Sequence, residues 1–474
     1  MARLWDSGAP PSLLRLVAVV YAVLMAVSLP QLIDPLVRHD DFPALLVDPS
    51  GFYAKTLHEG RWLNYWWHLR GVMTPAWANF AAYQLCWAVF CAAAARAALG
   101  RDAAVWPVLG LALLIAVAPP ALLISLWFNT LIPGLALVAL FAVLANRLPP
   151  RAMRWLLVLF VPLTLMAYTT YPLLLLAVCL TTHGAQTSWR DVAGPLAIFI
   201  ASFALGILAI YGLNYLEHGI FGIPMADWRT PQPTRDLASL MANLDRIGVV
   251  ARKTALAFAW GFTPLSVAHG LLAAGGLIVL WRAERWAAVA ALTVLIAGTG
   301  LLCLQILSTG VTVPVRAFGF VWMIHVVVMM RAALLLSRRG GLAARLARNM
   351  VIFIVASYLL QTARQYTDGW DWQAQTRALA QAAGPSGGAI ILRGDYRTLA
   401  GATRAGIQNA RGLRLRLVYL TGREVVLCAE TPQLCTGHPA TPPASARPVQ
   451  AGEALIAQHD GGSLIWLPST VPSR

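Results

Sequence analysis

The chain has 474 residues, of which 58% are hydrophobic and only 12% are charged. Soluble globular domains carry about 25% charged residues, so this composition excludes an ordinary soluble protein. The formal net charge of +16 is typical of a nucleic-acid-binding protein. However, the basic residues are arginines apart from Lys55 and Lys253, and most of them stand at the ends of apolar runs. The sequence therefore predicts a polytopic membrane protein that does not bind nucleic acid.

Eleven transmembrane helices are predicted from the length of the apolar runs. They cover residues 13–31, 73–98, 104–126, 131–146, 154–167, 169–182, 193–215, 255–281, 286–308, 315–336 and 349–364. Within 104–146, Pro133 follows Phe128-Asn129-Thr130 and suggests a tight reversal between two helices. The stretch 154–182 is either one long helix or two short ones that break near Tyr168-Thr169-Thr170-Tyr171-Pro172.

The distribution of arginine decides between these two readings. With eleven spans and a cytoplasmic N-terminus, fifteen arginines lie inside: Arg3, Arg15, Arg96, Arg101, Arg147, Arg151, Arg154, Arg190, Arg282, Arg285, Arg331, Arg338, Arg339, Arg345 and Arg348. Only four acidic residues accompany them. Counting 154–182 as one helix would move the arginines from Arg190 onwards outside, against the positive-inside rule. We therefore expect eleven spans and a C-terminus outside the cytoplasm.

This topology predicts a membrane domain over residues 1–365, with outside loops at 32–72 and 216–254, and a small extracytoplasmic α/β domain over 366–474. The tail opens with aromatic and charged residues that suit the membrane interface, namely Tyr366, Trp370, Asp371 and Trp372. It then reads as strands and one helix: strands Ala389–Leu392, Leu415–Leu420, Glu424–Cys428 and Ser463–Leu467, and helix Thr398–Ala410. The run Pro439–Pro448 is interpreted as a linker.

Two cysteines of the tail, Cys428 and Cys435, are close enough in sequence to close a small loop. Outside the cytoplasm a disulfide between them is favoured. A zinc site is the less favoured alternative, because such a site wants four ligands and only His438 stands nearby.

The first outside loop holds an acidic pair, Asp40-Asp41, directly after the first span and next to His39. Adjacent carboxylates repel one another, and a nearby cation, a metal ion or a raised pKa relieves that repulsion. Such a pair serves as a general base, as a ligand of a divalent cation such as Mg²⁺ or Mn²⁺, or as both. The alternative is that the two residues cap the following helix.

The segment Phe52–Leu69 follows the acidic pair and is rich in aromatic residues. It is typical of a helix that lies in the membrane interface. Arg61 and Arg70 would then lie near lipid phosphates, which arginine binds through its planar fork of N–H groups. Trp66 and Trp67 are interpreted as plain interfacial anchors.

The order of these features resembles the GT-C glycosyltransferases, integral-membrane enzymes that take sugars from polyprenyl-phosphate donors. The pair Asp40-Asp41 followed by Gly60-Arg61-Trp62 is most similar to the serotype-converting O-antigen glucosyltransferase family. The breaks at Tyr168-Thr169-Thr170-Tyr171 and Val313-Pro314-Val315-Arg316 fall where that family also carries polar positions. The resemblance covers the membrane part, whereas residues 385–474 match no family by their motifs.

The resemblance implies a GT-C-like fold and a hexosyltransferase of the bacterial inner membrane. In this reading Asp40 or Asp41 removes a proton from an acceptor hydroxyl, whose oxygen displaces the lipid phosphate with inversion. The departing phosphate needs positive charge. The candidate substrate-binding residues are Arg61, Arg316, Lys55, Arg70, His39 and Tyr65. The implied partners are a polyprenyl-phosphate sugar, with glucose as one candidate, and an acceptor such as lipopolysaccharide or another envelope glycan.

The loop 216–254 has nearly balanced charges, and most of them are interpreted as solvated. Within it, Glu217-His218 is the part expected to reach the substrate. His269 and His325 are interpreted as packing residues inside spans. Two other functions remain open: a flippase or transporter of polyprenyl-linked lipids, and a non-catalytic envelope protein whose tail binds a partner. A transporter is less favoured, because the predicted spans are almost free of acidic residues near their centres.

Overall fold

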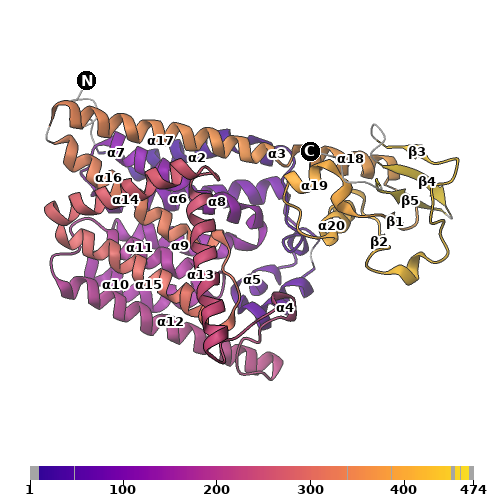
Figure 1. Ribbon diagram of the computed structural model, residues 1–474, viewed down its shortest axis with the longest axis horizontal. Helices are drawn as coiled ribbons and strands as arrows, with labels where there is room; N and C mark the ends of the chain where they lie inside the picture. The colour runs from indigo at the N-terminus through magenta and orange to yellow at the C-terminus, as the bar shows by residue number, and fades with distance from the viewer. Residues whose placement is uncertain are drawn as a thin grey trace. The chain divides into compact units, whose positions relative to one another are not determined.

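The computed structural model describes residues 10–46, 48–338, 340–385, 387–449, 454–459 and 461–468. The chain divides into two compact units, which are described separately (Figure 1). Unit 1 contains residues 1–27, 49–70 and 81–362, and unit 2 contains residues 28–48, 71–80 and 363–474. This division differs from the predicted boundary near residue 365, because the segment with the acidic pair belongs to unit 2.

Unit 1 is built from helices. They are α2 (Leu13–Val27), α4 (Ser50–Glu59), α5 (Trp62–His68), α6 (Ala76–Leu99), α7 (Val105–Ala116), α8 (Pro119–Ile124), η2 (Ser125–Trp127), α9 (Phe128–Ala145), α10 (Pro150–Leu165), α11 (Tyr171–Thr181), α12 (Trp189–His218), η3 (Asp227–Arg229), α13 (Leu237–Phe258), α14 (Thr263–Ala283), α15 (Arg285–Thr309), η4 (Val315–Phe318), α16 (Gly319–Ser337) and α17 (Gly341–Thr367). Helices α6 and α17 have residues in both units. In Figure 1, α13 runs across the direction of α10, α12 and α15.

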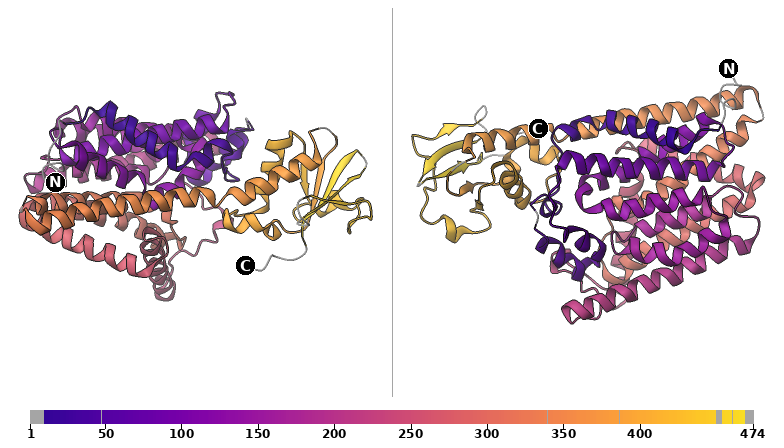
Figure 2. Two further views of the ribbon diagram at one scale, coloured as in Figure 1. Left: turned by 90° about the horizontal axis from the view of Figure 1, so that it is seen from above. Right: turned by 180° about the vertical axis from the view of Figure 1, so that it is seen from behind.

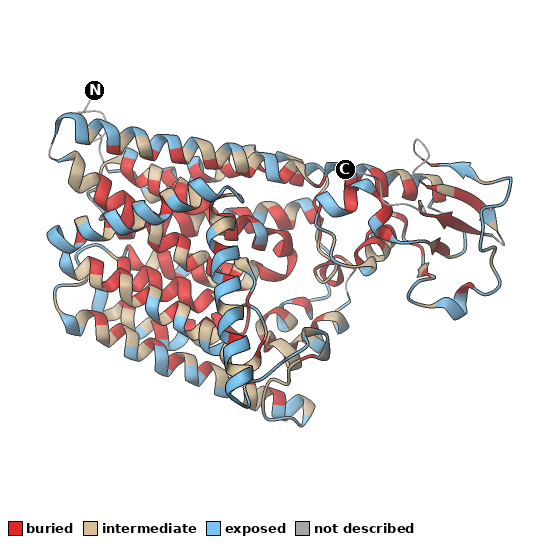
Figure 3. Ribbon diagram, in the orientation of Figure 1, coloured by how far each residue is buried: buried red, intermediate tan, exposed pale blue. Residues whose placement is uncertain are grey.

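Burial sorts these helices into inner and outer ones (Figure 3). Every residue of α11 is buried, so this helix forms the centre of unit 1. Helix α12 instead exposes large apolar side chains, among them Ile200, Leu205 and Leu208. An apolar exposed face is costly in water and favourable in lipid, and it therefore fits a helix at the lipid boundary.

Seven helical segments among the described residues are long and apolar enough to cross a membrane: Ala76–Leu99, Pro119–Ala145, Trp189–His218, Thr263–Ala283, Arg285–Thr309, Val315–Ser337 and Gly341–Ala383. Three apolar helices are shorter: α2, α7 and α11. By the length and composition of these helices the protein is a multi-pass helical membrane protein. The number of eleven spans and their orientation remain predictions.

The structure confirms one of the two expected helix breaks and moves the other. Helix α10 ends at Leu165 and α11 begins at Tyr171, so the stretch 154–182 contains two helices. The tight reversal expected at Phe128-Asn129-Thr130 is wrong, because α9 begins at Phe128 and continues through Pro133. The break lies earlier, because α7 ends at Ala116 and α8 begins at Pro119. Proline fits the first turn of a helix, since the backbone N–H that it lacks would have no partner there.

A second boundary also differs from the sequence prediction. The span expected at 255–281 is interrupted, because α13 ends at Phe258 and α14 begins at Thr263. Trp260 and Gly261 both have positive φ angles in this turn. Asp236 caps the start of α13 with its side chain, in a reciprocal hydrogen-bond pair with Ser239.

Unit 2 joins the N-terminal segment 28–48 to the C-terminal tail. Its remaining elements are α3 (Leu29–Ile33), η1 (Phe42–Ala44), α18 (Trp370–Ala383), β1 (Ile390–Arg393), η5 (Tyr396–Thr398), α19 (Ala400–Arg404), α20 (Ala410–Thr421), β2 (Val425–Leu427), η6 (Pro432–Cys435), β3 (Arg447–Pro448), β4 (Leu455–His459) and β5 (Gly462–Trp466). The sheet has the order β2-β1-β5-β4-β3, in which β1 runs parallel to β2 and β5, and β4 runs antiparallel to β3 and β5. Figure 2 shows this sheet from two further sides.

The small C-terminal sheet confirms three predicted strands, which correspond to β1, β2 and β5. The strand expected at Leu415–Leu420 is wrong, because these residues belong to helix α20. Its buried residues recur at helical spacing and include Arg416, which interrupts the apolar pattern and makes it look alternating. The helix expected at Thr398–Ala410 shrinks to the short α19.

Two further expectations for the tail are corrected. Trp372 is buried inside unit 2 and packs in the protein, so it is not an interfacial side chain. The end of the expected linker Pro439–Pro448 forms strand β3. Strand β4 was not predicted.

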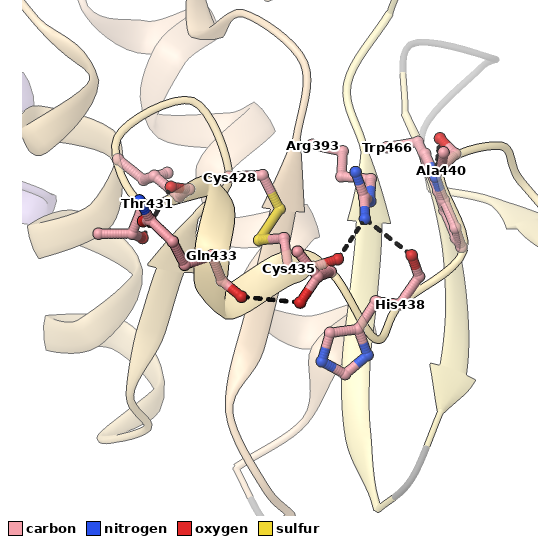
Figure 4. The surroundings of a disulfide bond; sticks show 10 residues. Arg393, Cys428, Thr431, Gln433, Cys435, His438, Ala440 and Trp466 are labelled. Carbon is pink, nitrogen blue, oxygen red and sulfur yellow. Dashed lines mark hydrogen bonds between the residues drawn. A yellow bond between two sulfur atoms is a disulfide. The ribbon is translucent and has the colours of Figure 1, made fainter.

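The disulfide between Cys428 and Cys435 is present in unit 2, as the sequence predicts (Figure 4). The loop that it closes is fixed to the sheet by Arg393 of β1. This arginine donates hydrogen bonds to the backbone carbonyl oxygens of Cys435 at 2.7 Å and His438 at 2.8 Å. The disulfide therefore belongs to the packing of the sheet edge.

Candidate functional site

The structure divides the predicted site residues between the two units. Lys55, Arg61, Tyr65, Arg70 and Arg316 belong to unit 1. The remaining three, His39, Asp40 and Asp41, belong to unit 2.

Gly60 places Arg61 at the junction of α4 and α5. It ends α4 with a φ of +68°, a left-handed conformation that glycine adopts without strain. A Cβ atom on this residue would lie 2.9 Å from Cγ2 of Ile210, so the close approach of α12 also requires glycine. The backbone conformation and the close approach of α12 therefore explain why residue 60 of the Gly-Arg pair is glycine.

Helix α5 is fixed to the break between α10 and α11. Trp62 donates from Nε1 to the side-chain oxygen of Asn214 at 2.9 Å. Asn64 donates from its side chain to the carbonyl oxygen of Ala167 at 2.9 Å, and the backbone N–H of Leu63 donates to that of Met166 at 3.1 Å. These bonds place the start of α5, with Arg61, beside Tyr168.

Arg61 contacts an acidic and an aromatic side chain. Its Nε lies 2.6 Å from Oε2 of Glu59, and its guanidinium carbon lies 5.4 Å from the ring centre of Tyr168. The same Glu59 carboxylate accepts from Nη2 of Arg229 at 2.8 Å. All three charged side chains are largely buried, with 14–22% of their surface exposed. The charged residues of loop 216–254 were mostly expected to be solvated, and Arg229 is an exception.

Arg316 reaches the same tyrosine from another element. It lies in η4, and its Nε donates to the hydroxyl oxygen of Tyr168 at 3.2 Å. Its guanidinium also lies over the ring of Trp127, 4.3 Å from the ring centre. A guanidinium is an efficient partner of an aromatic face. The structure therefore brings Arg61 and Arg316 together at Tyr168.

Arg316 has more N–H groups than its hydrogen bond to Tyr168 uses. Arginine has five N–H donors, and within the described part of the chain the Tyr168 hydroxyl accepts one of those of Arg316. Arg316 also lines a pocket of about 390 Å³, open solvent at its mouth included. The other walls are mostly apolar and aromatic, with Trp87, Tyr171 and Phe320 among them. A guanidinium at the edge of an apolar pocket suits a ligand that has both an anionic group and a hydrocarbon part.

Lys55, Tyr65 and Arg70 come from the same α4–α5 region as Arg61. Lys55 Nζ lies 5.7 Å from the ring centre of Phe52. Arg70 donates to the carbonyl oxygen of Trp67 at 2.7 Å and lies over the ring of that residue. Tyr65 packs against the ring of Tyr53 at 5.3 Å. Their role in substrate binding stays a prediction.

A buried histidine stands at the end of α5. The ring of His68 stacks on that of Phe52, with 4.0 Å between the ring centres. Burial, together with the smaller effect of the positive charges of Arg70 and Lys55, lowers the pKa of His68 from 6.5 to about 3. His68 is therefore neutral at physiological pH and acts as an aromatic packing residue.

His218 packs against residues of α4, and the expectation that it reaches the substrate stays a prediction. Its Nε2 lies 2.8 Å from Oγ1 of Thr56, and its ring packs against that of Tyr53 at 4.6 Å. The expectation that His269 and His325 are satisfied inside the helices is confirmed. Nδ1 of His269 lies 3.0 Å from Nε2 of His325.

In unit 2 the acidic pair lies on a compact turn. Asp41 is fully buried and occupies the N-cap position of η1, and Asp40 before it is partly buried. The Asp41 side chain makes no capping hydrogen bond, so capping of η1 does not explain this carboxylate. His39 lies near α20, since a side-chain carbon on Gly412 would lie 3.9 Å from the His39 Cβ.

Among the described residues, no group of three or more His, Cys, Asp or Glu side chains is placed to hold a metal ion. Mg²⁺ is commonly bound by one or two protein carboxylates together with water, so a divalent cation at Asp40 and Asp41 stays a prediction.

Tyr168, Trp127 and Glu59 are the site residues that sequence reasoning missed. The sequence marked Tyr168 only as part of a polar break between two spans. The available signal was that this break, Arg61 and Arg316 are all predicted on the outer side of the membrane.

A scan against protein-family models found no match to this chain, and a search of curated proteins found none.

Proposed function

We propose that the protein is an inverting glycosyltransferase of the GT-C type at the outer face of a bacterial inner membrane. It transfers a hexose, with glucose as the candidate, from a polyprenyl-phosphate carrier to an envelope glycan such as the O-antigen of lipopolysaccharide. The observation that carries the proposal is the convergence of Arg61 and Arg316 on Tyr168. Two guanidinium groups suit a phosphate, and the apolar pocket that Arg316 lines suits a hydrocarbon chain attached to that phosphate.

The charge changes of the reaction explain why two arginines are useful. An acceptor hydroxyl loses its proton to a carboxylate, and its oxygen forms a bond to the anomeric carbon of the sugar. The bond between that carbon and the phosphate oxygen breaks on the opposite face. The donor is a phosphodiester with one negative charge, and the departing polyprenyl phosphate carries two. Positive charge placed at the phosphate is therefore worth more in the transition state than in the bound donor.

The proposal gives the two sets of residues different roles. Arg316 and Arg61 bind the donor phosphate, and Tyr168 holds Arg316 by its hydroxyl group. Asp41 or Asp40 takes the proton from the acceptor. Support for Asp41 comes from its complete burial.

The test is a transfer assay with the full chain in lipid vesicles. Polyprenyl-phosphate glucose with a labelled sugar is incubated with the wild type and with a lipid-linked glycan fraction from a bacterial envelope. We expect labelled glycan from the wild type and a loss of about 100-fold in Arg316→Ala, in the range seen when one electrostatic donor is removed from an active site. Arg235→Gln is the matched control, because Arg235 is an exposed arginine of the loop 216–254.

Two outcomes of this assay contradict the proposal. Label that changes leaflet without becoming attached to glycan would favour a flippase or transporter. Transfer that is equally fast in Arg316→Ala and Arg235→Gln would remove the arginine site from the reaction.

A further inference from the structure

The acidic pair lies in a segment that unit 2 holds from both sides. Before the pair, Arg38 donates to the backbone carbonyl oxygens of Ala405, at 3.1 Å, and of Gly406 at the end of α19. After the pair, the ring of Phe42 packs against that of Tyr419 on α20, with 6.2 Å between the ring centres. The C-terminal tail therefore contacts this segment immediately before and after Asp40 and Asp41.

A buried ion pair fixes the start of the same segment. Nη2 of Arg416 lies 2.5 Å from Oδ2 of Asp34, and Nε of Arg377 lies 3.2 Å from the same oxygen. Only 4% of the Arg416 side chain is exposed, and 16% of that of Asp34. Gln373 also donates from its side chain to the backbone carbonyl oxygen of Asp34. Removing one partner of a buried pair leaves the other charge uncompensated, which makes such a contact costly to break.

Residues of α18 and α20 and at the end of α19 all contact the segment 34–42. Gln373 and Arg377 come from α18, and Arg416 and Tyr419 come from α20. They all bind the segment 34–42, which is more than 330 residues away in the chain. A domain that only binds an acceptor has no need to hold a distant N-terminal segment by a buried arginine.

We propose that the helices α18, α19 and α20 of unit 2 fix the position of the acidic pair and that Arg416 is a positioning residue for this pair. This inference rests on the proposed function, because it assigns Asp40 and Asp41 the role of base. Arg416 acts through Asp34, since it fixes where the segment enters the turn that carries the pair. Catalysis is sensitive to such placement, because a displacement of about 1 Å costs roughly 100-fold in rate.

The test compares two arginines of the same helix. Arg416→Met removes the buried guanidinium, and Arg414→Met is the matched control, because Arg414 is a more exposed residue that pairs with Glu430 at 3.7 Å. Arg416→Lys keeps a positive charge near Asp34. Each variant of the full chain is reconstituted, and kcat, the KM for the polyprenyl-phosphate sugar, and hydrogen exchange of peptides from 35 to 46 are measured.

We expect Arg416→Met to lower kcat by about 100-fold with little change in the KM for the donor. Hydrogen exchange in 35–46 should rise in the same variant, while Arg414→Met resembles the wild type and Arg416→Lys recovers part of kcat. Unchanged hydrogen exchange in 35–46 of Arg416→Met would overturn the proposal. Faster exchange with an unchanged kcat would also overturn it. Absence of transfer by the wild type would instead refute the proposed function, and the exchange result would still decide whether Arg416 holds the segment.

Discussion

Arg316 donates a hydrogen bond from Nε to the hydroxyl oxygen of Tyr168, and the two residues are separated by 148 positions in the sequence. The same tyrosine presents its ring to Arg61. Tyr168 is thus the residue through which two arginines, each a separate candidate by sequence, become one site. Its position between α10 and α11 follows from the break that divides these helices.

The hydroxyl of Tyr168 is expected to matter more than its ring for donor binding. In Tyr168→Phe the Arg316 guanidinium loses its acceptor while the stacking under Arg61 remains. A hydrogen bond to a charged group contributes about 1.5 kcal/mol or more, which corresponds to a rise of about 10-fold in the KM for the donor. Tyr215→Phe is the control, because Tyr215 is an exposed residue of α12. Equal KM values in the two variants would refute a role for the Tyr168 hydroxyl.

Glu59 is expected to compete with the donor phosphate for Arg61. In Glu59→Gln, Arg61 and Arg229 lose a carboxylate partner, and the local charge becomes more positive. We expect about threefold tighter binding of polyprenyl phosphate, which corresponds to about 0.7 kcal/mol. Titration of vesicles that contain the variant with polyprenyl phosphate measures this. Weaker binding would instead show that Glu59 orients Arg61 for the ligand.

His68 is expected to make stability depend on pH. Its pKa is lowered from 6.5 to about 3 in the folded protein, chiefly by burial. Between these values the unfolded chain binds a proton that the folded chain does not, so this contribution to stability is complete above about pH 6.5 and falls as the pH decreases towards 3. In His68→Phe, which preserves the stack on Phe52, thermal unfolding between pH 4 and 7 should vary less than in the wild type. An unchanged pH dependence would contradict this assignment.

Gly60 is expected to tolerate no side chain. In Gly60→Ala the residue keeps an unfavourable positive φ, and its new methyl group meets Ile210. Together these effects should destabilise unit 1 by roughly 1–3 kcal/mol. The double variant with Ile210→Val should recover part of the loss, because it removes a methyl group from the contact. A thermal midpoint equal to that of the wild type would show that α12 can move away from this junction.

The sequence predicted those parts of the fold that depend on local pattern. Long apolar runs predicted the membrane helices, and the two cysteines in the tail predicted their disulfide. Helix α20 was misread as a strand because buried Arg416 alternates with leucines, and its burial depends on Asp34, which is 382 positions away. No local pattern contains that partner.

The site was predictable to a similar degree. Arg61 was identified because it lies in a segment predicted to follow the membrane interface, where arginine binds lipid phosphate. Arg316 was identified because a charged residue at the end of an apolar span is costly without a partner. The partner itself, Tyr168, could not be identified, because an aromatic residue at a helix break is common in membrane proteins. Lys55, Arg70 and Tyr65 pack against aromatic side chains of the α4–α5 region, and their role in substrate binding stays a prediction.

The central claim is that the acidic pair and the arginine site together transfer a sugar. The most direct measurement is transfer of label from polyprenyl-phosphate glucose to glycan by vesicles that contain Asp41→Asn, Asp40→Asn or the control Asp245→Asn, an exposed residue of α13. We predict that at least one variant of the pair loses transfer while it still binds polyprenyl phosphate like the wild type, and that Asp245→Asn keeps full activity. Full activity in both Asp40→Asn and Asp41→Asn would contradict the account.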